Sequence, residues 1–326
     1  LCPDYAPFAP AWTPPTHPTE MLINRHGRTV DLSDLYAGCV AFAILGGPSA
    51  KTLPLDQLGK RGCLLISTNN CLAGLPYPLK PHIWTHTDPT HKFHWSIWRD
   101  PAILKFTPIK EWDAKCQHER PGPEVHKPKG LRHRADDGAL EFVPEASAHW
   151  TPGTFGYHRN TEFVPDRWLG EPSINRGNGI EYGPPKESDG KAGRKANGFP
   201  HTINTMFTVL RLAWYLGVKY LYLVGCDFRM TEEAAYGFNQ SKHPGGVRSN
   251  NNAYANMCVM FDALVPHFDK AGFVVRNCNP ASACWSFPHE SFDRAVDHAT
   301  CGIEQELNCK GWYDGINEPA EDRGDD

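Results

Sequence analysis

Five short apolar runs occur along the chain, and each one ends abruptly at small or polar residues. Strands that are buried on both faces of a sheet are apolar throughout rather than alternating. The pattern therefore predicts buried parallel strands. They span residues 39–45, 63–67, 82–85, 221–224 and 273–276.

Between these runs, apolar residues recur at helical spacing. Residues 203–216 form such a pattern, and Gly217 follows as a residue that commonly ends a helix. Helices are also predicted at 53–60, 252–271 and 291–300. Alternating strands and helices are typical of βαβ units. We therefore expect an α/β protein with a doubly wound, mostly parallel, Rossmann-like sheet, a long insertion and a C-terminal tail.

The middle of the chain has a different composition. Gly, Pro, His and charged residues dominate there, and the apolar periodicity is lost. We interpret this region as an insertion or lid carried by the core. The expected division is 1–115 for the first part of the core, 116–200 for the insertion or lid, 201–300 for the second part of the core and 301–326 for the tail.

Composition narrows the class of protein. The chain has 326 residues, of which 40% are hydrophobic and 21% charged, which is typical of a soluble globular protein with one or two domains. No window approaches the roughly 18 apolar residues of a transmembrane helix, so no membrane span is expected. The formal net charge of −4 gives no general case for nucleic-acid binding.

The cysteines indicate a compartment. There are 11, an odd number, and several lie within apolar runs, where free thiols behave as small hydrophobic groups. We expect a reducing, cytoplasmic setting. A structural zinc site is the competing interpretation, but the chain has no CxxC pair, and we expect no metal.

The residues that follow the strand runs are the candidate site. In doubly wound sheets the ligand lies outside the carboxyl ends of the strands. One polar strand end is ordinary turn chemistry, whereas five indicate a ligand site. These residues are Gly46, Gly47, Pro48, Ser49, Asn69, Asn70, Asp88, Asp227, Arg229, Asn279 and Ser282.

These residue types suit a nucleotide, although each has a structural alternative. The glycine turn at 46–49 lets the backbone approach a phosphate, or it is a plain turn with Ser49 as helix N-cap. Asn69 and Asn70 suit a ribose or a base edge, or they form Asx turns. Asp227 can bind a ribose, hold a metal or act as a base, or it accepts hydrogen bonds from loop amides.

A polar, glycine-bearing loop comes after Asp227. Arg229 or Tyr236 can stabilise a leaving phosphate. His243 can accept a proton from a hydroxyl nucleophile near neutral pH. The alternative for His243 is an exposed loop histidine.

Four histidines surround Asp88, but Pro89 argues against the helix that a metal site with their spacing needs. We expect most of them to be loop or surface residues. They are His82, His86, His91 and His94.

The segment Lys115–Arg134 is basic in an otherwise acidic chain. It is a candidate contact for a polyanion such as DNA. A solvated loop is the alternative.

Four segments taken together point to a family. GGPSA at 46–50, LAWYLGVKYLYLVGCDF at 212–228, YGF at 236–238 and NCNPAS at 277–282 occur in this order. The combination resembles the bacterial sialyltransferases of glycosyltransferase family 42. It also resembles the wider sialyltransferase-like group, which includes motility-associated-factor proteins and an archaeal 6-hydroxymethylpterin diphosphokinase. The segment HKFHWSIWRDPAILKF resembles uncharacterised phage proteins of this kind.

The resemblance covers roughly residues 39–90 and 200–296. It implies a Rossmann-like fold and a metal-independent, inverting transfer from a nucleotide sugar linked to CMP or UDP. By position, the turn at 46–49 approaches the donor phosphate and ribose, and Asn69 faces the nucleotide. Asn204 and Thr205 match a Thr-Ser pair of the family near the donor sugar.

The remaining correspondences concern the leaving group and the base. Tyr236 matches one of two tyrosines that hold the leaving phosphate, and Arg229 stands at the position of the other. Asp227 closes its strand beside the site. The strand end from Asn279 to Ser282 contacts the nucleotide base.

Two positions depart from the family pattern. The family's GNGPS motif reads LGGPS at 45–49, so its asparagine is missing. The catalytic histidine should fall within 247–255, where no histidine occurs, and His243 lies a few residues earlier.

We therefore expect a glycosyltransferase that moves a sugar to an acceptor hydroxyl, with His243, or else Asp227 or Asp88, as base. The acceptor is a glycan or a hydroxymethylated base of phage DNA. Transfer to such a base would be a DNA-modification reaction. One alternative is a magnesium-dependent diphosphokinase or other phosphotransferase with Asp88 and Asp227 as ligands. Another is a non-catalytic nucleotide-binding module.

Overall fold

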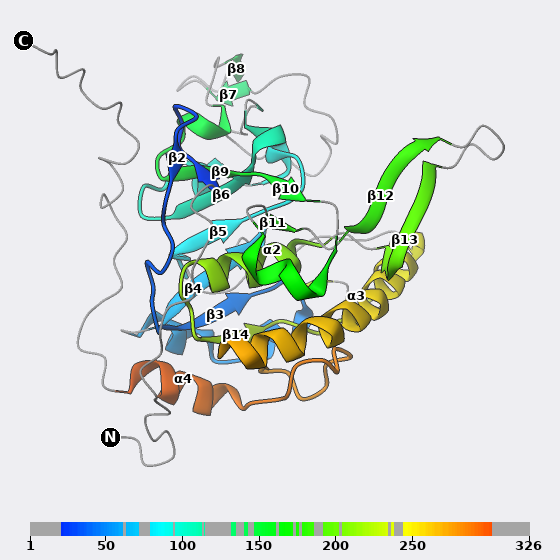
Figure 1. The fold of residues 1–326 in the computed structure, drawn as a ribbon. Helices are drawn as coiled ribbons and strands as arrows, with labels where there is room; N and C mark the ends of the chain where they lie inside the picture. The colour runs from blue at the N-terminus through cyan, green and yellow to red at the C-terminus, as the bar shows by residue number, and fades with distance from the viewer. Residues whose placement is uncertain are drawn as a thin grey trace, which may run out of the picture.

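The computed structural model gives one central sheet with helices packed against it (Figure 1). It describes residues 21–60, 63–71, 79–93, 95–112, 114, 132–134, 140–142, 147–160, 163–171, 174–175, 178–185, 192–201, 204–233, 236–237 and 244–301.

The central sheet has nine strands in the order β15-β14-β3-β4-β5-β6-β9-β1-β2. Neighbours from β15 to β9 pair in parallel, whereas β1 is antiparallel to both β9 and β2. The predicted α/β class with a mostly parallel sheet is confirmed. The strands are β1 (Leu22–Ile23), β2 (Thr29–Val30), β3 (Val40–Ile44), β4 (Leu64–Thr68), β5 (Ile83–Thr85), β6 (Leu104–Pro108), β9 (Thr154–Tyr157), β14 (Tyr220–Val224) and β15 (Val274–Asn277).

All five predicted strands are present, but β6 was not predicted because Lys105 interrupts its apolar pattern. The Lys105 side chain is nevertheless fully buried. Its ammonium group donates to the carbonyl oxygens of Asp100, Ile103 and Pro152 at 2.7, 2.9 and 2.6 Å. Three acceptors satisfy the three N–H donors of a lysine, so a charged residue lies inside a central strand.

Helices pack on both faces of the sheet. On one face, α2 (Thr205–Tyr215) and α3 (Pro244–Ala271) cover strand residues such as Ala41 and Ala43. On the other face, α4 (Phe292–Thr300) and two 3₁₀ turns cover Phe42 and Ile44. The alternation of Ala41 to Ile44 between the faces explains why β3 is apolar throughout.

Two helix predictions need correction. The helix expected at 53–60 is instead a pair of 3₁₀ turns, η1 (Pro48–Thr52) and η2 (Leu55–Gly59). Pro54 lies between them, and proline lacks the N–H that a continuous helix needs. The helix expected to begin at 252 begins at Pro244, eight residues earlier than predicted, because the first turns carry few apolar residues.

The segment 116–200, predicted as an insertion or lid, contributes β9 to the central sheet. Its strands also form small pairs, of which β12 and β13 extend away from the sheet (Figure 1). Of the basic segment Lys115–Arg134, the described part is Arg132–Arg134. Residues 302–326 of the predicted tail lie outside the described residues. The small strand pairs of the segment 116–200 are β7 (Arg132–Arg134) with β8 (Leu140–Phe142), β10 (Arg159–Asn160) with β11 (Ile174–Asn175), and β12 (Asn178–Pro185) with β13 (Ala192–His201).

Short helical elements complete the described chain. They are η3 (Thr90–Lys92), α1 (Trp95–Arg99), η4 (Ile109–Glu111), η5 (Ala148–Trp150) and η6 (Pro165–Gly170). None of the described helices is both long and apolar enough to cross a bilayer.

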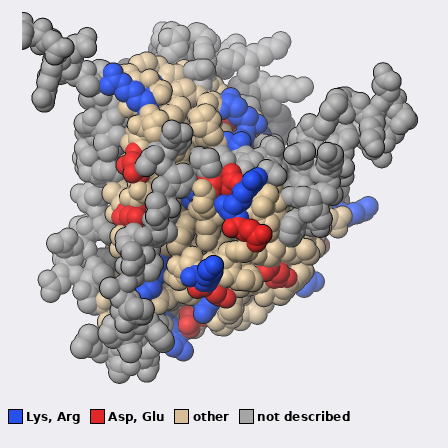
Figure 2. Space-filling view, viewed as in Figure 1, with Lys and Arg blue, Asp and Glu red and all other residues tan. Residues whose placement is uncertain are grey.

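Acidic and basic side chains are interspersed on the face seen in Figure 2 rather than gathered by sign. The described cysteines are all free, and most are buried.

The turn between α2 and β14 depends on a glycine. Gly217 ends α2, as predicted, with a φ of +84°, and a Cβ there would lie 2.9 Å from the Cα atoms of Asp34 and Ala37. Gly27 also has a positive φ, +72°, but no atom lies within 4 Å of its Cβ position.

Gly217→Ala should therefore destabilise the protein by about 2–5 kcal/mol, since a left-handed φ costs about 1–2 kcal/mol and overpacking adds about 1–3. Gly27→Ala should show only the conformational part, about 1–2 kcal/mol. Urea unfolding of both variants separates the two contributions. Equal losses would mean that the contact with residues 34 and 37 is unimportant.

Candidate functional site

The direction of strand addition changes between β3 and β14. From β3 the chain adds β4, β5, β6 and β9 on one side, whereas β14 and β15 lie on the other. In open parallel sheets, ligands bind outside the carboxyl ends of the strands where this direction changes. The ends of β3 and β14 are therefore the first place to look for a site.

The glycine turn after β3 lies directly against the end of β14. The N–H of Gly47 donates to the carbonyl oxygen of Gly225 at 2.8 Å. A Cβ on Gly47 would overlap that oxygen and the Asp227 carboxylate. Gly225 itself has a φ of +69°. Both glycines are thus required by the close contact of the two loops.

Asp227 connects three strand ends. Its carboxylate accepts from the Ser49 hydroxyl at 2.7 Å, from the Ser49 N–H at 3.3 Å and from the Asn279 side-chain amide at 3.2 Å. Burial raises the pKa of Asp227, and the hydrogen bonds from Ser49 oppose this rise. The N–H groups of Gly47 and Ser49 are thus already paired within the protein.

The loop after β15 is fixed to the same point. The Ser282 hydroxyl donates to the carbonyl oxygen of Cys226 at 2.6 Å, and the side chain of Asn277 donates to the same oxygen at 3.2 Å. The N–H of Ala283 donates to the carbonyl oxygen of Asp227 at 2.9 Å. Of the residues predicted from sequence, the structure brings Gly46, Gly47, Pro48, Ser49, Asp227, Asn279 and Ser282 together.

Tyr236 joins this cluster through its neighbour. The N–H of Gly237 donates to the carbonyl oxygen of Gly46 at 2.9 Å, and a Cβ on Gly237 would lie 2.8 Å from the carbonyl oxygen of Gly47. The segment that carries Tyr236 therefore lies on the glycine turn.

Arg229 is exposed, and the following residue is held firmly in place. The side chain of Asn251, from α3, accepts from the N–H of Met230 at 2.8 Å and donates to its carbonyl oxygen at 3.0 Å. His243, the predicted base, lies outside the described residues.

Tyr254 is a residue that sequence reasoning missed. It lies on α3, and its ring centroid is 4.9 Å from that of Phe228, the residue after Asp227. Burial, together with the neighbouring Tyr236, Cys226, Cys71 and Asp227, raises its pKa, so the phenol stays protonated. A tyrosine in a helical pattern gives no signal in the sequence that it faces a strand end.

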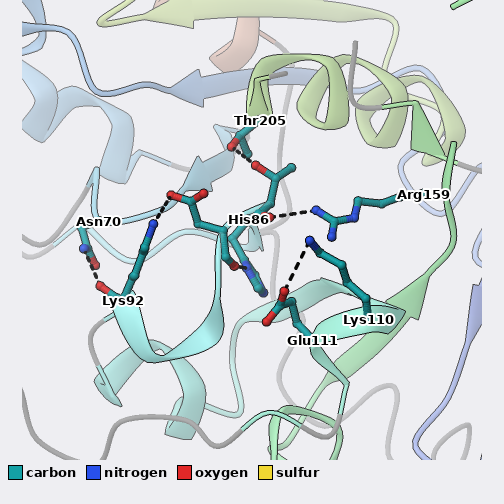
Figure 3. Close-up of polar contacts among 9 residues, drawn as sticks. Asn70, His86, Lys92, Lys110, Glu111, Arg159 and Thr205 are labelled. Atoms are coloured by element: carbon teal, nitrogen blue, oxygen red, sulfur yellow. Dashed lines mark hydrogen bonds and ion pairs between the residues drawn. The ribbon is translucent and has the colours of Figure 1, made fainter. Parts of the chain in front are cut away.

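The ends of β4 and β5 form a second group, shown in Figure 3. Asn69 has a φ of +50°, and its side-chain oxygen is buried without a hydrogen-bond partner among the described residues. Asn70 donates from its side chain to the carbonyl oxygen of Lys92 at 3.0 Å. Asp88 faces solvent and pairs with Lys92 at 3.2 Å.

The histidines near Asp88 act structurally where they are described. Burial lowers the pKa of His86 to about 3. The hydrogen bond between its Nδ1 and the carbonyl oxygen of Asp88 opposes this decrease. The ring lies among Trp84, Phe93 and Trp98. No group of three His, Cys, Asp or Glu side chains in the described part of the chain is arranged to hold a metal ion. The side chains of His91 and His94 lie outside the described residues.

Asn204 and Thr205 belong to this second group. The Asn204 side chain accepts from the N–H of Met206 at 2.9 Å and so caps α2. The hydroxyl groups of Thr205 and Thr87 lie 2.9 Å apart. The carbonyl oxygen of Thr87 accepts from Nη1 of Arg159 at 2.9 Å, as Figure 3 shows. Most of the described candidate residues thus fall into two groups at the carboxyl ends of the parallel strands.

Comparison of the chain with protein-family models, curated proteins and solved structures found no match. The resemblance to the sialyltransferase-like group therefore stays a prediction.

Asp227→Asn tests the connecting role of the carboxylate. The substitution places an NH₂ group among donors from Ser49 and Asn279, and a buried unpaired donor costs about 1–3 kcal/mol. Because burial raises the pKa of Asp227, its contribution to stability is fully present below the ordinary value of 3.8 and is lost as the pH rises through the raised value. The stability difference between wild type and Asp227→Asn should therefore shrink as the pH rises across this window.

Urea unfolding at several pH values measures this difference, and Asp56→Asn, at an exposed carboxylate of η2, is the matched control. A difference that grows with pH would mean that the ionised form is the better-accommodated one.

Proposed function

We propose that this protein is a nucleotide-sugar-dependent glycosyltransferase with a doubly wound, Rossmann-like core. The main support for this proposal is the polar cluster of Ser49, Asp227 and Asn279. It lies at the point where the direction of strand addition changes. This is where such sheets bind nucleotides.

In the proposed reaction, an acceptor hydroxyl attacks the anomeric carbon as the bond to the nucleotide phosphate breaks. Arg229 is exposed two residues after Asp227, and the segment of Tyr236 lies on the glycine turn, which supports assigning to both the stabilisation of the departing phosphate. Single displacement of this kind inverts the anomeric configuration. The donor is a CMP- or UDP-linked sugar, and the acceptor is a glycan or a hydroxymethylated DNA base.

The hydrogen bonds of Asp227 favour a positioning role for this carboxylate over that of base. Both of its oxygen atoms already accept bonds from Ser49, and Oδ1 accepts a further one from Asn279. His243 remains the proposed base. Tyr254, a neutral phenol, is a further candidate donor to the leaving phosphate.

The strand order argues against the magnesium-dependent alternative. That reaction would need Asp88 and Asp227 to share a metal ion. They follow β5 and β14, which are separated by β3 and β4. Three inter-strand spacings amount to about 14 Å, whereas ligands of one magnesium ion lie about 2.1 Å from it. Asp88 is also paired with Lys92.

The free cysteines support a reducing, cytoplasmic setting as part of the same proposal.

A thermal-shift screen with CMP, UDP, GDP and ATP, each with and without magnesium, tests the proposal. CMP or UDP should raise the melting temperature without metal, because a ligand at a hundred times its Kd adds about 2.7 kcal/mol of stability. Stabilisation by ATP only in the presence of magnesium would favour the phosphotransferase. No shift with any nucleotide would contradict nucleotide-dependent transfer.

Arg229→Gln should leave the melting temperature of the free protein unchanged and reduce the nucleotide-induced shift. Arg28→Gln is the matched control. Arg28 is exposed in the β1–β2 hairpin, and since β1 runs antiparallel to β9, this hairpin lies at the opposite edge of the sheet. Equal nucleotide-induced shifts of the melting temperature in Arg229→Gln and Arg28→Gln would mean that Arg229 does not bind the phosphate.

A further inference from the structure

Arg159 has a guanidinium group that the described residues pair only in part. Its Nη1 donates to the carbonyl oxygen of Thr87 at 2.9 Å, whereas Nη2 is buried and has no hydrogen-bond partner there. Buried donors without a partner are rare in proteins, and each one calls for an acceptor. On a charged group this acceptor is best an oxyanion, which a guanidinium binds through two parallel hydrogen bonds.

A second cation comes to the same place from the neighbouring strand. In the pairing of β6 with β9, Pro108 lies opposite Tyr157. Lys110 and Arg159 each follow two residues later, so both leave the sheet at its carboxyl edge. Figure 3 shows both side chains extending toward the segment of His86. The Lys110 side chain is 56% exposed, and its 3.7 Å contact with Glu111 is a long ion pair that leaves it able to bind a second anion.

The surroundings favour negative charge as well. The α2 helix begins beside Thr87, because the hydroxyls of Thr205 and Thr87 are 2.9 Å apart, and a helix N-terminus carries partial positive charge. Among the described residues of this group, three side chains are cationic and two are acidic, so cations are in excess. They are Lys92, Lys110 and Arg159 with Asp88 and Glu111.

This group is separate from the nucleotide crevice. Thr87, to which Arg159 binds, follows β5, and β5 lies two strands from β3, about 10 Å away. Lys110 and Arg159 themselves follow β6 and β9, which lie farther still from the switch point. If the proposed donor lies between β3 and β14 with its sugar toward β4 and β5, this group lies beyond the sugar, on the side from which we expect the acceptor to approach.

We propose that Arg159 and Lys110 bind a phosphoryl group of the acceptor, so that the acceptor is a phosphorylated molecule; its identification as the acceptor rests on the proposed glycosyl transfer. The phosphoryl group belongs either to a nucleic-acid backbone or to a small phosphomonoester. The two sources share the chemistry that the site recognises.

Titration calorimetry with inorganic phosphate and with a short single-stranded deoxyoligonucleotide tests this proposal on the full chain. Arg159→Gln should weaken binding of the preferred probe roughly tenfold or more, since a hydrogen bond to a charged group is worth about 1.5–3 kcal/mol. Lys110→Gln, at a half-exposed side chain that folding does not require, should weaken it in the same direction. Arg28→Gln, which removes the same charge at the opposite edge, should have no effect.

The salt dependence separates the two sources. If the ligand is nucleic acid, the oligonucleotide binds more tightly than phosphate, and Arg159→Gln reduces the slope of log K against log salt by about 0.7, the value for one phosphate contact on a single strand. If the ligand is a small phosphomonoester, the oligonucleotide binds no more tightly than inorganic phosphate. Equal affinities of wild type, Arg159→Gln and Lys110→Gln for both probes would overturn the proposal.

The outcome is distinguishable from that of the nucleotide screen. Arg159→Gln should retain the melting-temperature shift produced by CMP or UDP, because the nucleotide crevice lies elsewhere. If Arg159→Gln loses both that shift and the binding of phosphate, Arg159 belongs to the donor site. This result would also overturn the acceptor assignment. Failure of every nucleotide in wild type would reject glycosyl transfer, whereas Arg159-dependent phosphate binding would still establish the anion site.

Discussion

The close approach of the glycine turn after β3 to the end of β14 is the constraint on which the site depends. Gly47 hydrogen-bonds the backbone of Gly225 at 2.8 Å, and this spacing leaves no room for a Cβ. At this distance the Asp227 carboxylate reaches both the hydroxyl and the N–H of Ser49. The bond from Asn279 then adds the loop after β15. Three loops that are distant in sequence are thereby held in one arrangement before any ligand binds.

This arrangement changes the expected role of the glycine turn. Its N–H groups at residues 47 and 49 are paired with Gly225 and Asp227, so they hold the site together rather than contact a phosphate. The ligand contacts that we propose are therefore side chains around the turn, chiefly the exposed Arg229 and the tyrosines of α3 and its preceding loop. Preorganised polar groups of this kind need no rearrangement during a reaction.

The apolar runs predicted the central strands well, because a strand buried on both faces must be apolar along its length. The same rule failed for β6, where Lys105 is buried through three carbonyl acceptors supplied by the fold. The polar strand ends were also readable. Their division into two groups was not, since it depends on strand order, which sequence patterns do not contain. Arg159 and Tyr254 were missed for the same reason: each reaches the edge of the sheet from a distant segment.

A crystal structure of the protein with CMP or UDP would test the central claim most directly. The account predicts density for the nucleotide between the ends of β3 and β14, in contact with the loops of Ser49 and Asn279, and no displacement of the bonds that Asp227 makes to them. A nucleotide bound elsewhere, or one that breaks these bonds in order to bind, would contradict it.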